Sequence, residues 1–382
     1  MSELWLPPLS LYIHIPWCQR KCPYCDFNSH ESRDTLPEAD YIDALLGDLE
    51  QDLAYVQGRS LQSIFIGGGT PSLFSGAALR RLLEGVNHRV AVETDAEITL
   101  EANPGSAEAD KFADFVSAGV NRISLGIQSF DNQLLQALGR VHNSDQALAA
   151  IEMARSVGLK SFNIDLMHGL PGQSLESART DLQTAIDCRP PHLSWYQLTI
   201  EPNTEFYKRP PLLPGESILG NIQDSGEALL AREGYESYEV SAYARSGHAC
   251  KHNLNYWQFG DYLGIGAGAH SKLTLTGQGQ VTRFAKRRQP EEYLAAEPGA
   301  LRVQSRKLSE TDLIGEFMLN ALRLVDGFDL QTFSRHTGLA VAVLDEKMAG
   351  LQEQGLLELV HGRVQASARG RRFLDSVIAE FF

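Results

Sequence analysis

The sequence predicts an α/β fold, a partial (β/α)6 barrel followed by a small C-terminal helical, winged-helix-like domain. Apolar, β-branched runs alternate with helix-like segments over roughly the first 200 residues, and three cysteines follow the first of these runs. After about Pro290 the pattern changes to helices and one short hairpin. Connections between parallel strands are right-handed, so successive βα units wrap round and close, or nearly close, a barrel.

Each expected strand is short and rich in β-branched or aromatic residues. The strands are "LSLYIHI" (9–15), "SIFIGG" (63–68), "EITLEA" (97–102), "RISLGIQ" (122–128), "SFNIDLM" (161–167) and "HLSWYQLTI" (192–200). Between them we expect helices at Glu38–Val56, Ala77–His88, Ala107–Ala118, Ser144–Val157 and Leu175–Cys188. Strands that alternate with helices in this way form parallel βα units.

The remainder of the chain is less regular. We expect the barrel and a following α/β extension to occupy residues 1–285, with a helix at Glu216–Glu233. Residues 290–382 are expected to form the C-terminal domain, with three helices, the hairpin "LLELVHGRVQAS" (356–367) and the terminal helix "RRFLDSVIAEFF" (371–382). The order suits a winged helix, but its acidic context argues against contact with DNA.

Composition narrows the functional classes. An apolar fraction of 43% and a charged fraction of 21% are typical of a soluble globular enzyme. The net charge of −14 repels a phosphate backbone, so we expect no nucleic-acid partner. "MSELWLPPLS" is not a signal peptide, and the longest uncharged run (60–79) contains "GGGTP", which cannot continue a membrane helix. We therefore expect no transmembrane segment and a cytoplasmic location, where five cysteines favour metal binding over disulfides.

Polar residues lie at the ends of five consecutive expected strands. They are Cys18, Cys22 and Cys25 after the first, "GGGTP" (67–71) after the second, and then Glu101, Gln128 and Asp165. A single acidic residue at a strand end usually caps a helix or lies on the surface. Because the carboxyl ends of barrel strands meet at one face, the five together predict a site there.

The three cysteines have the spacing C-x3-C-x2-C, which brings three thiolates of one short loop around a single centre. Zinc would need a fourth ligand, for which His14 and His30 are candidates. A four-iron cluster held by three cysteines leaves one iron with an open position, where a substrate or cofactor binds. This spacing, with the aromatic Tyr24 before the last cysteine, resembles the signature of the radical S-adenosylmethionine (SAM) superfamily.

The resemblance extends over nearly the whole chain. "YIHIPWCQRKCPYC", "GGGTPS", "LGIQSF", "NIDLMHGLPGQ" and the C-terminal segment are similar to the branch that contains oxygen-independent coproporphyrinogen III oxidase and the HemW-type haem chaperones. The resemblance implies a radical SAM barrel in which Cys18, Cys22 and Cys25 hold a [4Fe-4S] cluster, with SAM on the fourth iron. The cofactor-binding residues that it implies are Tyr12, Tyr24, Gly68, Gly69, Thr70, Glu101, Gln128, Arg140, Asp165 and Thr199.

These residue types suit such a cofactor. Glycines let the backbone approach the methionine end of SAM, where a side chain would block it. Carboxylates complement the sulfonium and amino groups and accept from ribose hydroxyls, while Arg140 can pair with a carboxylate. Without the cysteines, "GGGTP" would be read as a flexible turn. A second glycine run, "GIGAGAH" (264–270), lacks the spacing of a dinucleotide loop.

Within the branch, two departures point away from the oxidase. The oxidase has a further cysteine where this chain has Phe27, and an N-terminal extension where only 11 residues precede Tyr12. The resemblance therefore implies a haem chaperone that binds the cluster, SAM and haem and transfers haem to acceptors such as respiratory haem enzymes. It implies reductive cleavage of SAM with a reductant such as flavodoxin, and peripheral contact with membrane enzymes. Oxidative decarboxylation of coproporphyrinogen III to protoporphyrinogen IX is the alternative, and we do not expect it.

The segment "HNLNYW" (252–257) looks like the motif associated with haem in the chaperone group. His252 offers an imidazole ligand, and the aromatic residues after it offer flat faces for a macrocycle. A lone histidine beside aromatic residues can equally be a packed, hydrogen-bonded core residue, and Cys250, His248 and His270 are other candidate ligands. A third reading makes the cluster structural and the protein only an adaptor.

Overall fold

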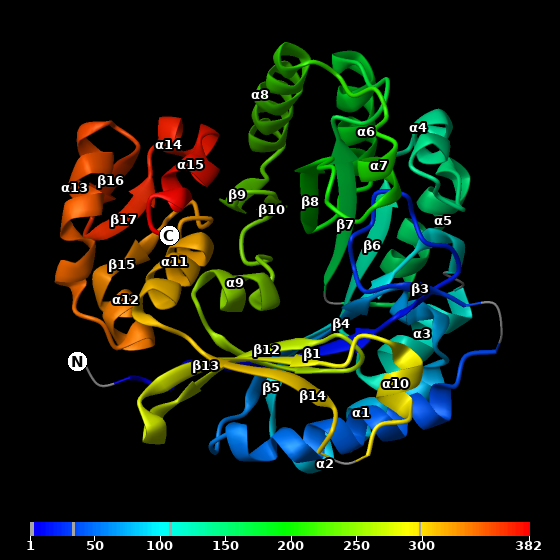
Figure 1. Cartoon of the computed structure of the whole chain (residues 1–382). Coiled ribbons are helices and arrows are strands. Elements are labelled where there is room, and N and C mark those ends of the chain that lie inside the picture. The colour runs from blue at the N-terminus through cyan, green and yellow to red at the C-terminus, as the bar shows by residue number, and fades with distance from the viewer. Residues whose placement is uncertain (1–3, 33–34, 107–108, 160, 298) are drawn as a thin grey trace.

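The computed structural model describes residues 4–32, 35–106, 109–159, 161–297 and 299–382. Across these residues the largest sheet has 12 strands, in the order β14-β13-β12-β11-β1-β4-β5-β6-β7-β8-β10-β9. In Figure 1 the sheet turns from the flat β1 and β4 to the upright β7 and β8. Its parallel strands β1 (Leu9–Ile15), β4 (Leu61–Gly68), β5 (Val92–Ala102), β6 (Arg122–Gln128), β7 (Ser161–His168) and β8 (His192–Gln197) confirm the six predicted strands.

The barrel is open, as predicted, because its first and last strands do not pair. β1 pairs in parallel with β11 (Asp261–Ile265), and β8 pairs antiparallel with β10 (Ala242–Ala244). Further antiparallel strands extend both edges, namely β9 (Glu236–Glu239), β12 (His270–Leu275), β13 (Gln280–Lys286) and β14 (Arg302–Lys307). The short segment α9 (Lys251–Trp257) lies between β10 and β11 along the chain.

Helices cover the outer face of the parallel strands (Figure 1). They are α1 (Glu38–Asp52), α2 (Gly76–Arg89), α3 (Ala109–Ala118), α5 (Ser144–Ser156), α6 (Leu175–Asp187) and α8 (Glu216–Arg232), whereas α4 (Asn132–Ala137) and α7 (Glu205–Lys208) pack in a small apolar cluster next to the cysteine loop. The predicted helices are confirmed, although positions 107 and 108 of one lie outside the described residues. Side chains at Asn143 and Ser174 cap α5 and α6 in capping boxes. No helix in the described part of the chain is long and apolar enough to cross a membrane.

The period of two along each strand divides its side chains between two faces. Ile13, Ile64 and Ile123 are fully buried with apolar residues of the helices, such as Leu45 and Leu82. The alternate positions of the same strands carry mostly polar side chains, which face the barrel interior. This division is what places the strand-end polar residues inside the barrel rather than under the helices.

A buried ion-pair network ties α1 to the edge of the sheet. Lys286 Nζ on β13 lies 2.5 Å from Asp48 Oδ1 and 2.7 Å from Asp52 Oδ2. Tyr293 Oη donates to Asp48 Oδ2 at 2.7 Å, and Arg302 pairs with Asp52. Each buried charge has an opposite partner, so removal of one member leaves the others uncompensated.

The C-terminal part has a core of its own, centred on Phe317 and Phe333. Its elements are α11 (Glu310–Ala321), β15 (Phe328–Asp329), α12 (Leu330–Thr337), α13 (Asp345–Glu353), β16 (Leu357–Val360), β17 (Arg363–Ala366), α14 (Ala368–Arg372) and α15 (Leu374–Ala379), whereas α10 (Pro290–Leu294) packs against α1 in the main core. β16 and β17 form the predicted hairpin, and β15 adds a third strand. The predicted continuous terminal helix is wrong, because the chain leaves helical geometry at Phe373 between α14 and α15.

Candidate functional site

The cysteine loop follows the end of β1 and is closed by a short parallel pair. β2 (Trp17–Cys18) pairs with β3 (His30–Glu31), and the His30 N–H donates to Pro16 O at 2.7 Å. Cys18 is buried, whereas Cys22 and Cys25 are partly exposed, and all three are free thiols. The loop therefore holds three thiols of one strand end at the carboxyl edge of the sheet.

Polar groups surround these thiols. Arg140 Nη1 donates to Cys22 Sγ at 3.5 Å, and Ser29 Oγ lies 3.7 Å from Cys25 Sγ. Burial raises the pKa of the Cys18 and Cys25 thiols, against hydrogen bonds from Thr70 and Ser29. A guanidinium beside a sulfur stabilises the thiolate form, which is the form that ligates iron.

The zinc alternative does not find its fourth ligand in His14. The Nδ1 atom of this residue lies 2.8 Å from Tyr12 Oη and its Nε2 atom 2.8 Å from Asn28 O, so both ring nitrogens are engaged. His30 Nε2 lies 3.2 Å from Asn28 Oδ1. Over the described ranges, no group of three or more His, Cys, Asp and Glu side chains is arranged for a single metal ion.

The glycine turn is a fixed element rather than a flexible one. The Gly69 N–H donates to Ile15 O at 2.8 Å, which ties the turn to the end of β1. Gly68 has a φ of 118°, and a Cβ on it would lie 2.5 Å from His14 Cε1. A Cβ on Gly69 would lie 2.4 Å from Trp17 O. The glycines thus let this backbone pass directly under the cysteine loop, where no side chain fits.

Two carboxylates lie inside the barrel beside this turn. Glu101 Oε2 accepts from the Gly68 N–H at 3.0 Å, and burial, followed by the nearby Asp165, raises the pKa of Glu101 to about 7. Asp165 accepts from Ser124 Oγ at 2.9 Å and from Asn163 Nδ2 at 2.7 Å, and burial raises its pKa as well. Two buried carboxylates close to one another favour a cationic ligand, and the sulfonium and ammonium groups of SAM are cationic.

The remaining strand-end residues are also hydrogen-bonded. Gln128 ends β6 in the left-handed region, with a φ of 70°, and its Oε1 accepts from Tyr196 Oη at 2.9 Å. Arg140 Nη2 donates to Gly126 O at 2.7 Å and also to Asn103 Oδ1. Such a backbone conformation in a non-glycine residue is uncommon and is held by its surroundings, as functional sites often are.

The sequence analysis missed three polar residues that bond to predicted site residues, Asn103, Asn163 and Tyr196. Asn103 Nδ2 donates to Thr70 Oγ1 at 2.9 Å and so links the glycine turn to Arg140. Asn103 and Asn163 each lie two positions from a predicted carboxylate, which was the available signal. A small cavity between the cysteine loop and these residues is lined by Gln19, Arg20, Cys22, Thr70, Asn103, Gly139, Arg140 and Val141.

Thr199 lies at the margin of the site, exposed just beyond the end of β8. Tyr24 lies beside Cys22 and Arg140, and its ring centroid is 6.3 Å from that of Phe206. Tyr12 also lies in the site, since its hydroxyl meets His14 and its ring stacks on Phe65.

His252 lies apart from this site, toward the other end of the strands. Its backbone N–H donates at 3.1 Å to Glu97 Oε1, four residues before Glu101 on β5. Its ring stacks on Phe65 with 4.1 Å between centroids and is only 7% exposed. Burial, and then Arg122, lower the pKa of His252 to about 3, and its Nδ1 is buried without a hydrogen-bond partner. His252 in this position is neutral and shielded from solvent.

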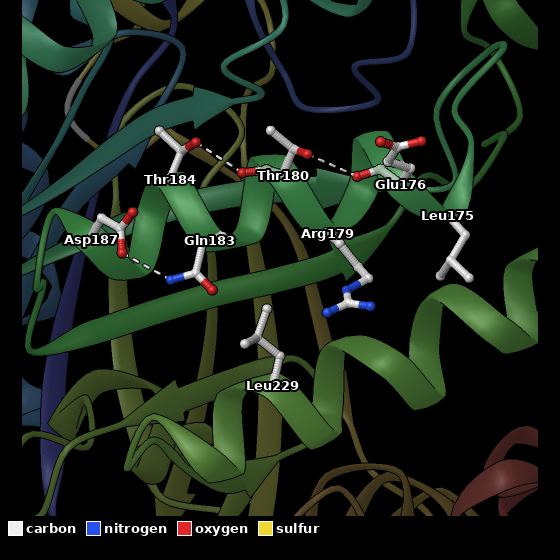
Figure 2. A pocket seen from close by; sticks show the side chains of 8 residues that line it. All are labelled: Leu175, Glu176, Arg179, Thr180, Gln183, Thr184, Asp187 and Leu229. Atoms are coloured by element: carbon white, nitrogen blue, oxygen red, sulfur yellow. Dashed lines mark hydrogen bonds between the residues drawn. The ribbon is translucent and has the colours of Figure 1, made fainter.

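A groove outside the barrel, between α6 and α8, has a volume of about 670 Å³. Figure 2 shows that Thr180 and Thr184 donate back to carbonyls of their own helix and that Gln183 bonds Asp187. The side chains of Thr180, Gln183 and Thr184 are therefore engaged within their own helix. The groove holds none of the predicted site residues.

Comparisons with known proteins cover nearly the whole chain. The radical SAM superfamily model matches residues 12–185, and the HemN C-terminal domain model matches residues 308–373. The chain is 51% identical over 376 residues to the Heme chaperone HemW of Escherichia coli (strain K12) and 50% identical over 380 residues to that of Haemophilus influenzae, with 98% of each chain covered. Its structure resembles coproporphyrinogen III oxidase (HemN) from Escherichia coli, with a TM-score of 0.83 and coverage of 98% and 90%. At 24% identity, the latter shows the fold alone.

Proposed function

The chain belongs to the radical SAM superfamily and, within it, to the HemW family, and from this membership we propose that it is a haem chaperone. The superfamily implies a [4Fe-4S] cluster and SAM, and the relatives named heme chaperones cover the chain from end to end. The main structural support for the proposal is that three free thiols, a glycine turn and two buried carboxylates lie together at one edge of the sheet.

Each group has a role that its chemistry fits. Cys18, Cys22 and Cys25 hold the cluster, which supplies an iron with an open position and an electron for cleavage of SAM. The glycine turn admits the methionine end of SAM. Glu101 and Asp165 accept hydrogen bonds from SAM and balance its positive charge. Thr199 lies on the rim, where it can close the pocket over the cofactor.

Phe27 is a sequence difference that favours the chaperone over the oxidase. It occupies the place of the oxidase's further cysteine and is 59% exposed beside the cluster loop. An exposed aromatic side chain cannot ligate iron, but it offers an apolar contact to a partner protein. The proposed partners are a reductant such as flavodoxin and haem acceptors such as respiratory haem enzymes, in the cytoplasm or at the membrane periphery.

The candidate haem ligands differ in their exposure to solvent. His252 and Cys250 are buried in and before α9, at 7% and 1% exposure, so ligation by either requires α9 to move. His270, at the start of β12, is exposed as the chain stands. We propose His252, because its Nδ1 is buried without a hydrogen-bond partner and its neighbours Tyr256 and Phe65 offer aromatic faces.

Anaerobic reconstitution followed by separate titrations with SAM and with haem tests the function. We expect a Soret shift on addition of haem, a weaker or altered spectrum in His252→Ala, and the parental spectrum in His270→Ala. Coproporphyrinogen III with SAM and reductant should remain unconverted. Decarboxylation without haem binding would replace the chaperone by the oxidase reading, and a spectrum lost only in His270→Ala would move the ligand to His270.

A further inference from the structure

Three neighbouring residues inside the barrel carry buried polar atoms that are not satisfied by the protein itself. Thr99 of β5 pairs in register with Arg122 of β6, and Arg122 pairs with Ser161 of β7. Within the part of the chain that the structure describes, Thr99 Oγ1, Arg122 Nε and Ser161 Oγ are buried without a hydrogen-bond partner. We call these residues the donor triplet, because a guanidinium and two hydroxyl groups can all donate.

The donor triplet faces the barrel interior. Residues that pair in register on neighbouring strands project to the same face of a sheet. The next residue along each strand, Leu100, Ile123 or Phe162, packs in the apolar core under the helices, so the triplet takes the opposite face. Glu101, a proposed SAM ligand, is the following residue of β5 on that inner face. The triplet therefore lies one layer of side chains further into the barrel than the proposed SAM pocket, toward the start of the strands.

Arg122 is buried without the hydrogen bonds that a guanidinium needs. It is 3% exposed, and Glu97 Oε2 lies 3.9 Å from its Nε, beyond hydrogen-bond distance. The other oxygen of Glu97 accepts from the Cys250 thiol and from the His252 N–H, which hold this carboxylate away from Arg122. Arg140, by contrast, donates to a sulfur, an amide oxygen and a carbonyl oxygen. Buried charged groups are normally hydrogen-bonded, so Arg122 has donors for a further acceptor.

The chemistry of the donor triplet selects an acceptor with one negative charge. A guanidinium forms charge-assisted hydrogen bonds with a carboxylate, and the flanking hydroxyl groups can donate to the same oxygens. A phosphate would bring a second negative charge close to Glu97 and Glu101. A carboxylate brings a single charge, opposite the single guanidinium of the triplet.

We propose that Thr99, Arg122 and Ser161 bind a carboxylate group inside the barrel. Two sources carry this group, namely a small free carboxylate and a propionate of haem. The second source rests on the proposed function, whereas the first does not. The proposed haem ligand His252 donates to Glu97, the residue that faces Arg122, so both flank the same carboxylate.

The first experiment uses sodium formate, the smallest carboxylate, and needs no haem. The melting temperature of cluster-loaded protein is measured at constant ionic strength while formate replaces chloride. Formate at ten times its dissociation constant should raise the melting temperature of the parent by about 2 °C, from the linkage of binding to unfolding in a chain of 382 residues. No change in the parent would exclude a free carboxylate as the source.

Hydroxyl variants separate a binding role from a structural one. Thr99→Val and Ser161→Ala remove groups that bond nothing in the described protein, so neither should melt below the parent in chloride. Each removes one donor to the ligand and should lose about half or more of the formate shift. Ser10→Ala is the matched control, because this interior hydroxyl bonds Ser63 Oγ at 2.8 Å, and it should keep the full shift. An equal formate shift in all of these proteins would mean an adventitious salt effect.

The second experiment compares haem with haem dimethyl ester, whose propionates carry no charge, by Soret titration. The parent should bind haem about tenfold or more tightly than the ester, as expected for hydrogen bonds to a charged group. The preference should fall to about one in Arg122→Gln, decrease in Thr99→Val and persist in Ser10→Ala.

The two experiments together identify the source of the carboxylate. A triplet-dependent formate shift alone indicates a free carboxylate, and a triplet-dependent preference for haem alone indicates a propionate. A parent with neither effect would overturn the carboxylate site and leave water as the acceptor. If the parent binds no haem at all, the proposed function fails, and the formate measurement by itself decides whether the donor triplet binds a carboxylate.

Discussion

Glu101→Gln should make the cofactor-free pocket more stable and bind SAM less well. Burial raises the pKa of Glu101 from its usual 4.5 to about 7. At about 1.4 kcal/mol for each pKa unit, the folded state loses up to about 3 kcal/mol by ionising this group, somewhat less if water screens it. Glutamine keeps an acceptor for the Gly68 N–H, which now lies 3.0 Å from the carboxylate, and removes the charge.

The sign of the pH dependence is fixed by which state holds the proton. Between pH 4.5 and about 7 the folded chain keeps a proton on Glu101 that the unfolded chain has lost. Stability of the parent therefore falls as pH rises through this window and is level above it. The advantage of Glu101→Gln should be largest at pH 8 and below about 1 kcal/mol at pH 5.

Thermal unfolding of cluster-loaded protein checks this prediction. Unfolding entropy of about 2.1 cal/mol/K per residue gives about 0.8 kcal/mol/K for 382 residues. The full effect thus raises the melting temperature by about 4 °C at pH 8. Added SAM should stabilise the parent more than the variant, because the cation favours the ionised carboxylate. Glu84→Gln, exposed on α2, is the matched control. A melting temperature that is equal or lower at pH 8, with unchanged SAM affinity, would refute the placement of Glu101.

The cluster, the glycine turn and the buried ion pairs each give a further expectation. Alanine at any one of the three clustered cysteines should abolish about four irons per chain in an iron assay, and Cys188→Ala should retain them; zinc in stoichiometric amount would contradict this. Gly68→Ala places a Cβ 2.5 Å from the His14 ring and should abolish SAM binding, whereas Gly47→Ala, with nothing within 4 Å, should leave it intact; equal SAM binding in both would show that the turn is not tight. Lys286→Met leaves Asp48 without a cationic partner and Asp52 with Arg302 alone, and should cost about 3–5 kcal/mol in urea unfolding; a cost below about 1 kcal/mol would mean that water reaches Asp48.

The parallel strands and the cysteine loop were predictable because their signals are local. β-branched runs of seven or eight residues and the spacing of three cysteines can be read without knowing any long-range contact. The antiparallel strands at the two edges of the sheet were not predicted as such. β14 is almost wholly exposed, with the burial pattern of a surface segment, so no apolar alternation marks it.

The position of α9 was also beyond the sequence. Its helix is held by Glu97 and Tyr238, which lie 155 and 14 residues away from His252, and by Gln62, which bonds Asn255 at 2.8 Å. No local sequence pattern indicates at which end of the barrel such a helix lies. The motif predicted haem ligation by His252, with a packed core histidine as the alternative, and only the packing against Phe65 shows that the ring is buried.

Polar side chains in the barrel interior form a row of hydrogen bonds that runs from the strand-end carboxylate Asp165 to α9. An interior filled with apolar side chains would insulate the strand-end carboxylates from α9, because dispersion contacts carry no orientation. Hydrogen bonds do carry one, since each group in the row from Asp165 to Tyr238 donates on one side only when its neighbour accepts. As long as Asp165 is ionised, the amide of Asn163 and the ring of His192 are therefore held in one orientation. The same polar residues that are costly to bury thus order the interior beside the strand-end carboxylates, because each of them is hydrogen-bonded.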